Sequence, residues 1–138
     1  MRRFYKWFPL LAIPLACFNL ELLLMGRYTS DAAKSAIAFN FLLPSNDVLQ
    51  ITLNGVLLIL AVVILFFEIC KSTSASTVSI VEHALSVMVF IIFLMEFLLM
   101  PGLGTAEFLL TTLISLVDVL AGITVSITAA RRDFQISR

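Results

Sequence analysis

The sequence predicts an all-α integral membrane protein, a bundle of four transmembrane helices with short loops that forms one domain over residues 1–138. Hydrophobic residues make up 61% of the chain and charged residues 13%, whereas soluble domains are close to half apolar and a quarter charged. Four apolar runs reach the roughly 20 residues that cross about 30 Å of hydrocarbon. A soluble chain of this composition would expose larger apolar patches than monomers tolerate.

The four predicted transmembrane runs cover residues 5–25, 48–70, 77–100 and 106–130. We expect the first run to be retained rather than cleaved as a signal, because its apolar stretch continues past Cys17. Pro9 and Pro14 should bend it. Pro101 and Gly102 cannot comfortably continue a helix, so they predict a tight antiparallel hairpin between the third and fourth runs.

The loop of residues 26–47 between the first two runs is longer and not wholly polar. Its segment "SDAAKSAIAFNFLLPSND" begins with the cap-type residues Ser30 and Asp31 and stops at Pro44. The apolar content favours a short interfacial helix over residues 31–43, lying at the membrane surface. The partial alternation in "IAFNFLL" leaves a strand as the alternative.

Basic residues predict how the chain is threaded. With the N-terminus inside, the cytoplasmic set is Arg2, Arg3, Lys6, Lys71, Arg131, Arg132 and Arg138, and the outer set is Arg27 and Lys34. This bias follows the positive-inside rule. Both termini are therefore predicted to be cytoplasmic, with the loop of residues 26–47 on the outer side.

Small and polar residues line one face of the fourth run. Residues three or four apart share a helix face, and this spacing collects Thr111, Ser115, Asp118, Gly122, Ser126 and Ala129. Small residues let helices approach closely, and hydroxyl groups can hydrogen-bond across the contact. Because a carboxylate at this depth costs roughly 2.5–3.5 kcal/mol on insertion scales, Asp118 should face other helices. Asn54 and Ser86 are its first candidate partners.

The other intramembrane ionisable groups fall into layers by depth. Glu68, Glu82 and His83 lie toward the cytoplasmic side, and Glu21, Glu96 and Glu107 lie toward the outer side, with Asp118 alone near the middle and no Lys or Arg among them. We expect His83 to hydrogen-bond Glu68 or a hydroxyl of the loop between the second and third runs. The candidate site residues are Asp118, His83, Glu82, Glu68, Glu96, Glu21, Ser115 and Gly122.

The sequence offers no nucleophile–base pair, metal-ligand spacing or phosphate-binding motif. Cys17 and Cys70 are isolated, and the single histidine, His83, excludes bis-histidine haem ligation within one chain. Nine basic and nine acidic residues give zero formal charge, which does not favour nucleic-acid binding. We therefore expect no enzyme activity, cofactor or metal.

Four stretches carry a resemblance to known proteins: "FFEICK", "EHALS", "EFLLMPGLGTAEFLL" and "DVLAGITVSITAARRD". Together they cover about residues 50–134, and the chain there resembles small four-helix inner-membrane proteins of alphaproteobacteria. That family has no assigned activity. The resemblance implies a bacterial inner membrane, and it marks Glu68, His83, Glu96, Gly104 and Asp118 as positions of the shared pattern with no role attached.

Two functions follow as expectations. The first is a non-enzymatic accessory or scaffold subunit that acts through its polar and small helix faces on another membrane protein or on a second copy, within the lipid bilayer. The alternative is a dimeric proton-coupled small transporter or channel, with Asp118 as the coupling acid and Glu82 and His83 along the exit path. Against the alternative, Glu21 lies near the outer end of its run, and no inverted repeat is evident.

Overall fold

The computed structural model describes residues 8–25, 37–72 and 79–136. Over these residues the chain forms, in order, α2 (Ala12–Met25), β1 (Ile37–Leu42), β2 (Val48–Thr52), α4 (Leu53–Ser72), α5 (Ser79–Leu99) and α6 (Ala106–Ile136). It is thus mostly helical, with four helices in the described part. Three of them contain spans long and apolar enough to cross a membrane: Leu53–Lys71, Val81–Leu99 and Ala106–Thr128.

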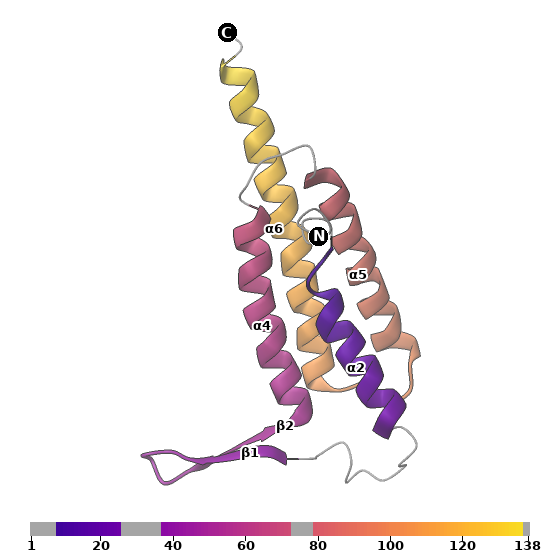
Figure 1. Cartoon of the computed structure of the whole chain (residues 1–138), viewed down its shortest axis with the longest axis vertical. Coiled ribbons are helices and arrows are strands. Elements are labelled where there is room, and N and C mark those ends of the chain that lie inside the picture. Colours follow the sequence, from indigo (N-terminus) through magenta and orange to yellow (C-terminus); the bar gives the residue numbers. More distant parts are fainter. Residues whose placement is uncertain (1–7, 26–36, 73–78, 137–138) are drawn as a thin grey trace.

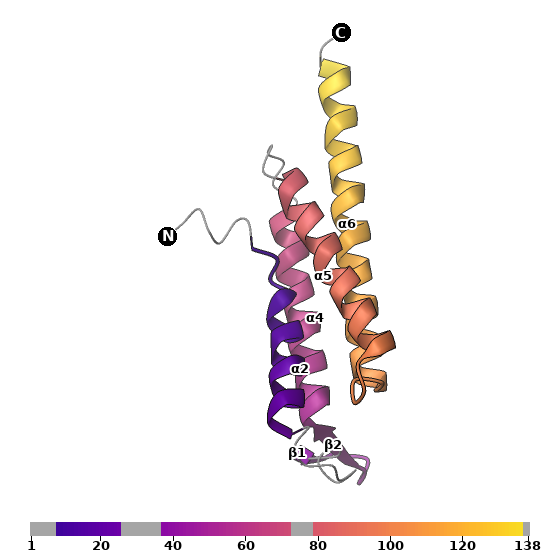
Figure 2. The same cartoon turned by 90° about the vertical axis from the view of Figure 1, so that its right-hand side faces the viewer.

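The helices lie side by side and alternate in direction along the chain (Figure 1, Figure 2). α6 packs against both α4 and α5, while α2 packs against α4. At the centre of the core is Phe108 of α6, which is fully buried. Its ring lies 5.1 Å from that of Phe18 in α2 and 5.5 Å from that of Phe93 in α5, measured between centroids. Aromatic contacts therefore join three of the helices.

The first helix is shorter than predicted. α2 contains 14 residues, which is about 21 Å at 1.5 Å per residue, whereas the predicted run of residues 5–25 would cross the whole hydrocarbon core. Residues 8–11 are not helical, and residues 5–7 lie outside the described part. Pro9 precedes the helix, because proline lacks an N–H and disfavours helical geometry in the residue before it. Pro14 lies in the first turn, where the N–H groups have no intrahelical acceptor.

The interfacial helix favoured for residues 31–43 is wrong over residues 37–42, and the strand alternative is right there. β1 pairs antiparallel with β2, with Asn40 opposite Gln50; residues 31–36 lie outside the described part. In the connecting turn, Asn46 has a φ of 67°, a left-handed conformation that asparagine tolerates better than most residues. The Asn46 N–H donates to the Leu43 carbonyl at 2.9 Å. The turn reverses the chain direction, so that β1 and β2 can pair as a hairpin.

Pairing with β1 also moves the start of the second predicted run from residue 48 to Leu53. The hydroxyl of Thr52 accepts a hydrogen bond from the Gly55 N–H at 3.1 Å. Threonine is a favoured residue at this capping position, because its side chain satisfies one of the free N–H groups of the first turn. Thr52 is therefore both the last residue of β2 and the cap of α4.

The predicted hairpin between the third and fourth runs is confirmed. α5 ends at Leu99, and Gly102 has a φ of 98°, a value that glycine adopts without strain. The Thr105 hydroxyl then caps α6 by accepting from the Phe108 N–H at 3.2 Å. α6 continues to Ile136 rather than ending at residue 130, and it extends past the other helices (Figure 1). The end of the apolar run therefore does not mark the end of the helix, because no glycine or proline stops the helix there.

Candidate functional site

The predicted small and polar face of α6 points into the bundle. Thr111, Ser115, Asp118 and Gly122 are buried, whereas Leu113, Val117, Leu120 and Ile123 are exposed. Two of the hydroxyls do not bond across the contact as predicted: Thr111 donates to the Glu107 carbonyl at 2.8 Å, and Ser115 donates to the Thr112 carbonyl at 2.7 Å. Each hydroxyl therefore has its hydrogen-bond acceptor on its own helix. The burial of the face is confirmed for Thr111, Ser115, Asp118 and Gly122, while Ser126 is half-buried and the side chain of Ala129 lies outside the described part.

Seven residues line a small cavity near the end of the bundle where α4 finishes and α5 begins. We call it the polar cavity. Its lining residues are Glu68, Lys71, Glu82, His83, Ser86, Asp118 and Gly122. Its volume is about 10 Å³, which is close to the lower limit for holding one water molecule. The cavity brings together five of the predicted site residues: Glu68, Glu82, His83, Asp118 and Gly122.

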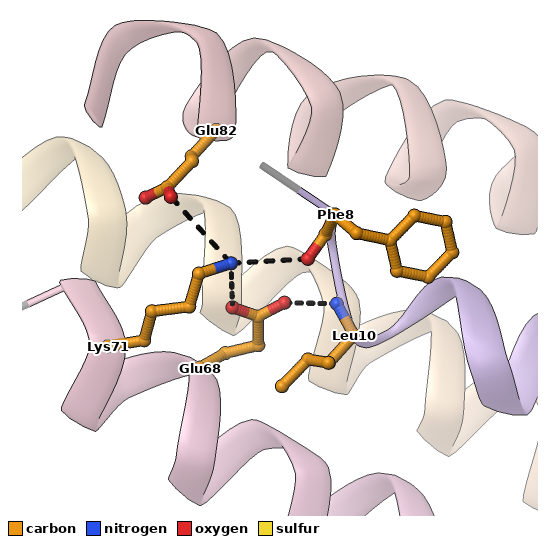
Figure 3. A network of polar contacts seen from close by, with 5 residues as sticks. All are labelled: Phe8, Leu10, Glu68, Lys71 and Glu82. Carbon is orange, nitrogen blue, oxygen red and sulfur yellow. Dashed lines mark hydrogen bonds and ion pairs between the residues drawn. The ribbon is translucent and has the colours of Figure 1, made fainter. Parts of the chain in front are cut away.

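The Lys71 ammonium ties two helices to the chain ahead of α2 (Figure 3). Its Nζ lies 3.6 Å from Glu68 Oε2 and 3.8 Å from Glu82 Oε1. It also donates to the carbonyl of Phe8 at 3.1 Å. The prediction that the acids have no nearby cation is therefore wrong, because the long lysine side chain reaches back over the end of its own helix.

Glu68 supplies the start of α2 with an acceptor from another helix. One carboxylate oxygen accepts a hydrogen bond from the Leu10 N–H, and the other faces Lys71 (Figure 3). The first N–H groups of a helix lack intrahelical partners, and a negative charge near this end is favourable. Leu10 lies two residues ahead of α2, so Glu68, only 6% exposed, pairs a backbone donor just before the helix from 58 residues away in the sequence.

Asp118 belongs to the same cavity, so its predicted isolation near the middle is wrong. Ser86, His83 and Lys71 line the cavity with it and are close enough to interact with its carboxyl group. Of its two predicted partners, Ser86 lies beside it in the cavity, while Asn54 faces Glu21 instead. His83 shares the cavity with Glu68 as its depth predicted. A direct hydrogen bond between His83 and Glu68 stays a prediction.

The ring of His83 packs directly over Gly122. A Cβ atom placed on Gly122 would overlap the Nδ1 and Cε1 atoms of the ring. α5 and α6 can therefore approach this closely only because residue 122 has no side chain. The predicted small-residue contact is confirmed at this position, and the group that fills it is the one histidine in the chain.

A second polar group lies near the opposite end of the bundle. Asn19 of α2 donates through Nδ2 to Glu96 Oε2 of α5 at 2.8 Å. The Asn54 amide of α4 faces Glu21, and the orientation that satisfies both groups places Nδ2 2.7 Å from Oε2 and 2.9 Å from Oε1. Glu107 of α6 interacts electrostatically with Glu21. Glu21, Glu96 and Glu107 therefore lie toward the same end of the bundle, and amides pair two of them.

Sequence reasoning missed the pairing roles of Lys71, Asn19 and Asn54. For Lys71 a local signal was available, because Glu68 and Lys71 are spaced i,i+3 and such pairs meet on a helix surface. The amides carry no comparable signal, since their partners come from other helices.

The described residues contain no group of three or more His, Cys, Asp or Glu side chains placed to hold a metal ion. Cys17 is half-buried in α2, and Cys70 is exposed on α4. Across the same residues, every buried side-chain nitrogen or oxygen has a hydrogen-bond partner. The arrangement can join helices, exchange protons among neighbouring groups, or hold a single water molecule.

Comparison of the chain with protein-family models, with curated proteins and with solved structures finds no match.

Proposed function

We propose that this chain is a multi-pass protein of a bacterial inner membrane, in which α2, α4, α5 and α6 form one bundle in the bilayer. Three spans have the required length and apolar character, and large apolar side chains cover their outer surfaces. Examples are Phe66 and Phe67 on α4, Met95 and Leu98 on α5, and Val117 and Leu120 on α6, all exposed by 47–67%. In water, this much apolar surface would be unfavourable.

The backbone ahead of α2 supports the same proposal. Irregular backbone is tolerated inside a membrane only where protein satisfies its polar groups. Here Glu68 accepts from the Leu10 N–H, and Lys71 donates to the Phe8 carbonyl. Both groups would otherwise be unpaired beside a helix of only 14 residues.

The positive-inside bias predicts the threading. Single-cysteine variants of the full chain in a background lacking Cys17 and Cys70 should react with a membrane-impermeant maleimide from the periplasm at Ser45. Positions 3 and 135 should react only after the cells are opened. The reason is the excess of lysine and arginine on one side of the predicted spans. Labelling of position 135 from the periplasm would contradict the arrangement.

Within the membrane, we assign the protein a non-enzymatic accessory or scaffold role. The observation that carries this assignment is that interior polar groups pair between helices: Lys71 of α4 with Glu82 of α5, and Asn19 of α2 with Glu96 of α5. Its outer faces remain available: only 11% of the α5 span is buried. Because the described small and polar face of α6 is used inside the bundle, a partner would meet apolar surface. The partner is another membrane protein or a second copy of this chain.

The alternative of proton-coupled transport has one observation in its favour: Asp118, His83 and Lys71 are close enough to interact electrostatically beside Ser86. Groups that exchange protons must lie within hydrogen-bond reach of one another or of a bridging water. The polar cavity has room for about one such water.

Substitution of Asp118 separates the two functions. Asparagine keeps the shape and an acceptor for Ser86, so Asp118→Asn should be nearly neutral for stability, whereas Asp118→Leu should cost about 1–2 kcal/mol, the scale of an interhelical hydrogen bond in a membrane. Unfolding in mixed detergent micelles measures both. For an accessory subunit, proteoliposomes of the parent and of Asp118→Asn should show the same background proton flux, and the tagged parent should recover a stoichiometric partner from native membranes.

One result would contradict this assignment, and a second would show that Asp118 has no structural role. Proton flux that is present in the parent and lost in Asp118→Asn, with the fold intact, would establish the transport alternative. Equal stability of both variants would show that Asp118 does not hold helices together.

A further inference from the structure

The β1–β2 hairpin projects sideways from the end of the helices (Figure 1). β2 ends at Thr52 and α4 begins at Leu53, so no linker separates the hairpin from the apolar span of α4. The hairpin therefore lies at the depth where that span begins, and it extends across the direction of the helices rather than along them.

One face of the hairpin is wholly apolar. Phe39 pairs with Ile51 and Phe41 pairs with Leu49, and side chains directly opposite each other lie on the same face of a sheet. The rings of Phe39 and Phe41 stack with centroids 6.3 Å apart. Phe39, Phe41 and Leu49 are 55%, 54% and 47% exposed. A two-stranded hairpin on its own is only marginally stable in water, so its apolar face needs another surface to pack against.

The absence of charge on the two strands indicates what kind of surface this face contacts. β1 (IAFNFL) and β2 (VLQIT) contain no charged residue, and Asp47 lies in the turn between them. The other face carries the polar pair Asn40 and Gln50 in its middle and the apolar pair Leu42 and Val48 beside the turn. A surface that is apolar on one side and uncharged on both suits the boundary between lipid headgroups and acyl chains. The strand edges are open, so the hairpin cannot lie within the hydrocarbon core, where unpaired backbone groups are not tolerated.

We propose that the hairpin is a membrane-surface anchor whose Phe39–Phe41–Leu49 face inserts into the lipid boundary beside α4. This inference rests on the proposed membrane location and adds a lipid-binding surface to it. The occupant is the bilayer itself, because β2 runs without a linker into the apolar span of α4. Since the strands carry no lysine or arginine, insertion should not depend on anionic lipids.

Fluorescence quenching in vesicles tests this anchor. In the full chain with Cys17 and Cys70 replaced by serine, an environment-sensitive fluorophore is attached at Phe41→Cys or Leu49→Cys. Matched controls on the opposite face are Asn40→Cys and Gln50→Cys. In phosphatidylcholine vesicles, the first two labels should shift to the blue and lose most of their fluorescence to a quencher carried at shallow depth by a lipid, while the controls stay bright. Adding phosphatidylglycerol should leave the result unchanged.

A label at Phe66→Cys, on the exposed surface of α4, separates a failure of the anchor from a failure of the proposed membrane location. If that label is quenched by a deep lipid quencher while Phe41→Cys behaves like Asn40→Cys, the anchor is wrong and the membrane location stands. If Phe66→Cys is not quenched, the membrane location itself fails. If unlabelled Phe41→Cys forms an intermolecular disulfide in the vesicles, and its labelled form shifts to the blue without lipid quenching, the anchor is wrong and the face contacts a second copy.

Discussion

Glu68→Leu is expected to lower the free energy of unfolding by about 3 kcal/mol. This is the lower end of the range for removing one partner of a buried ion pair, because Lys71 keeps Glu82 at 3.8 Å and the Phe8 carbonyl at 3.1 Å. The variant also leaves the Leu10 N–H without its acceptor, and a buried donor that loses its partner is destabilising. Unfolding of the purified protein in mixed detergent micelles, followed by circular dichroism, measures the change.

Three matched variants separate the causes. Glu68→Gln keeps an oxygen for the Leu10 N–H and loses only the charge, so it should be less harmful than Glu68→Leu. Glu82→Gln removes a more exposed and more distant partner of Lys71 and should cost no more than about 1 kcal/mol. Glu68→Leu combined with Lys71→Leu removes both charges and should recover part of the loss. If Glu68→Leu were as stable as the parent, the Glu68 contacts would not hold α2 to α4.

Gly122→Ala is the second large effect, with an expected destabilisation of about 1–2 kcal/mol. Alanine is the better helix former by about 1 kcal/mol, so an ordinary helical glycine would gain stability from this change. Here the new methyl group overlaps the His83 ring, and forcing extra atoms into a packed contact typically costs 1–3 kcal/mol. The same unfolding assay measures the net effect.

A double-mutant cycle shows whether the His83 ring is the cause. In a His83→Ala background the overlap is gone, so Gly122→Ala should become neutral or stabilising. Gly104→Ala is a useful control, because nothing lies within 4 Å of a Cβ atom at that position. If Gly122→Ala destabilised equally with and without the ring, the close approach of α5 and α6 would depend on something other than His83.

The sequence by itself determined the features that depend on local pattern. Apolar length located the spans of α4, α5 and α6, because hydrophobic runs of about 20 residues have few other uses. Pro101 and Gly102 located the α5–α6 turn. The spacing of Thr111, Ser115, Asp118 and Gly122 predicted which face of α6 is buried, because helix periodicity is a property of neighbouring residues alone.

Only the tertiary structure decided where the polar side chains of different helices meet. Glu68 contacts the Leu10 N–H across 58 residues, and Lys71 contacts Phe8 across 63. These contacts place the start of α2, and no local signal predicts them. Asp118 joined Ser86 rather than Asn54, because depth alone does not say which neighbour faces a side chain. Residues 37–42 became a strand because pairing with Val48–Thr52 satisfies their backbone, and such pairing between separate segments overrides a weak local preference for helix.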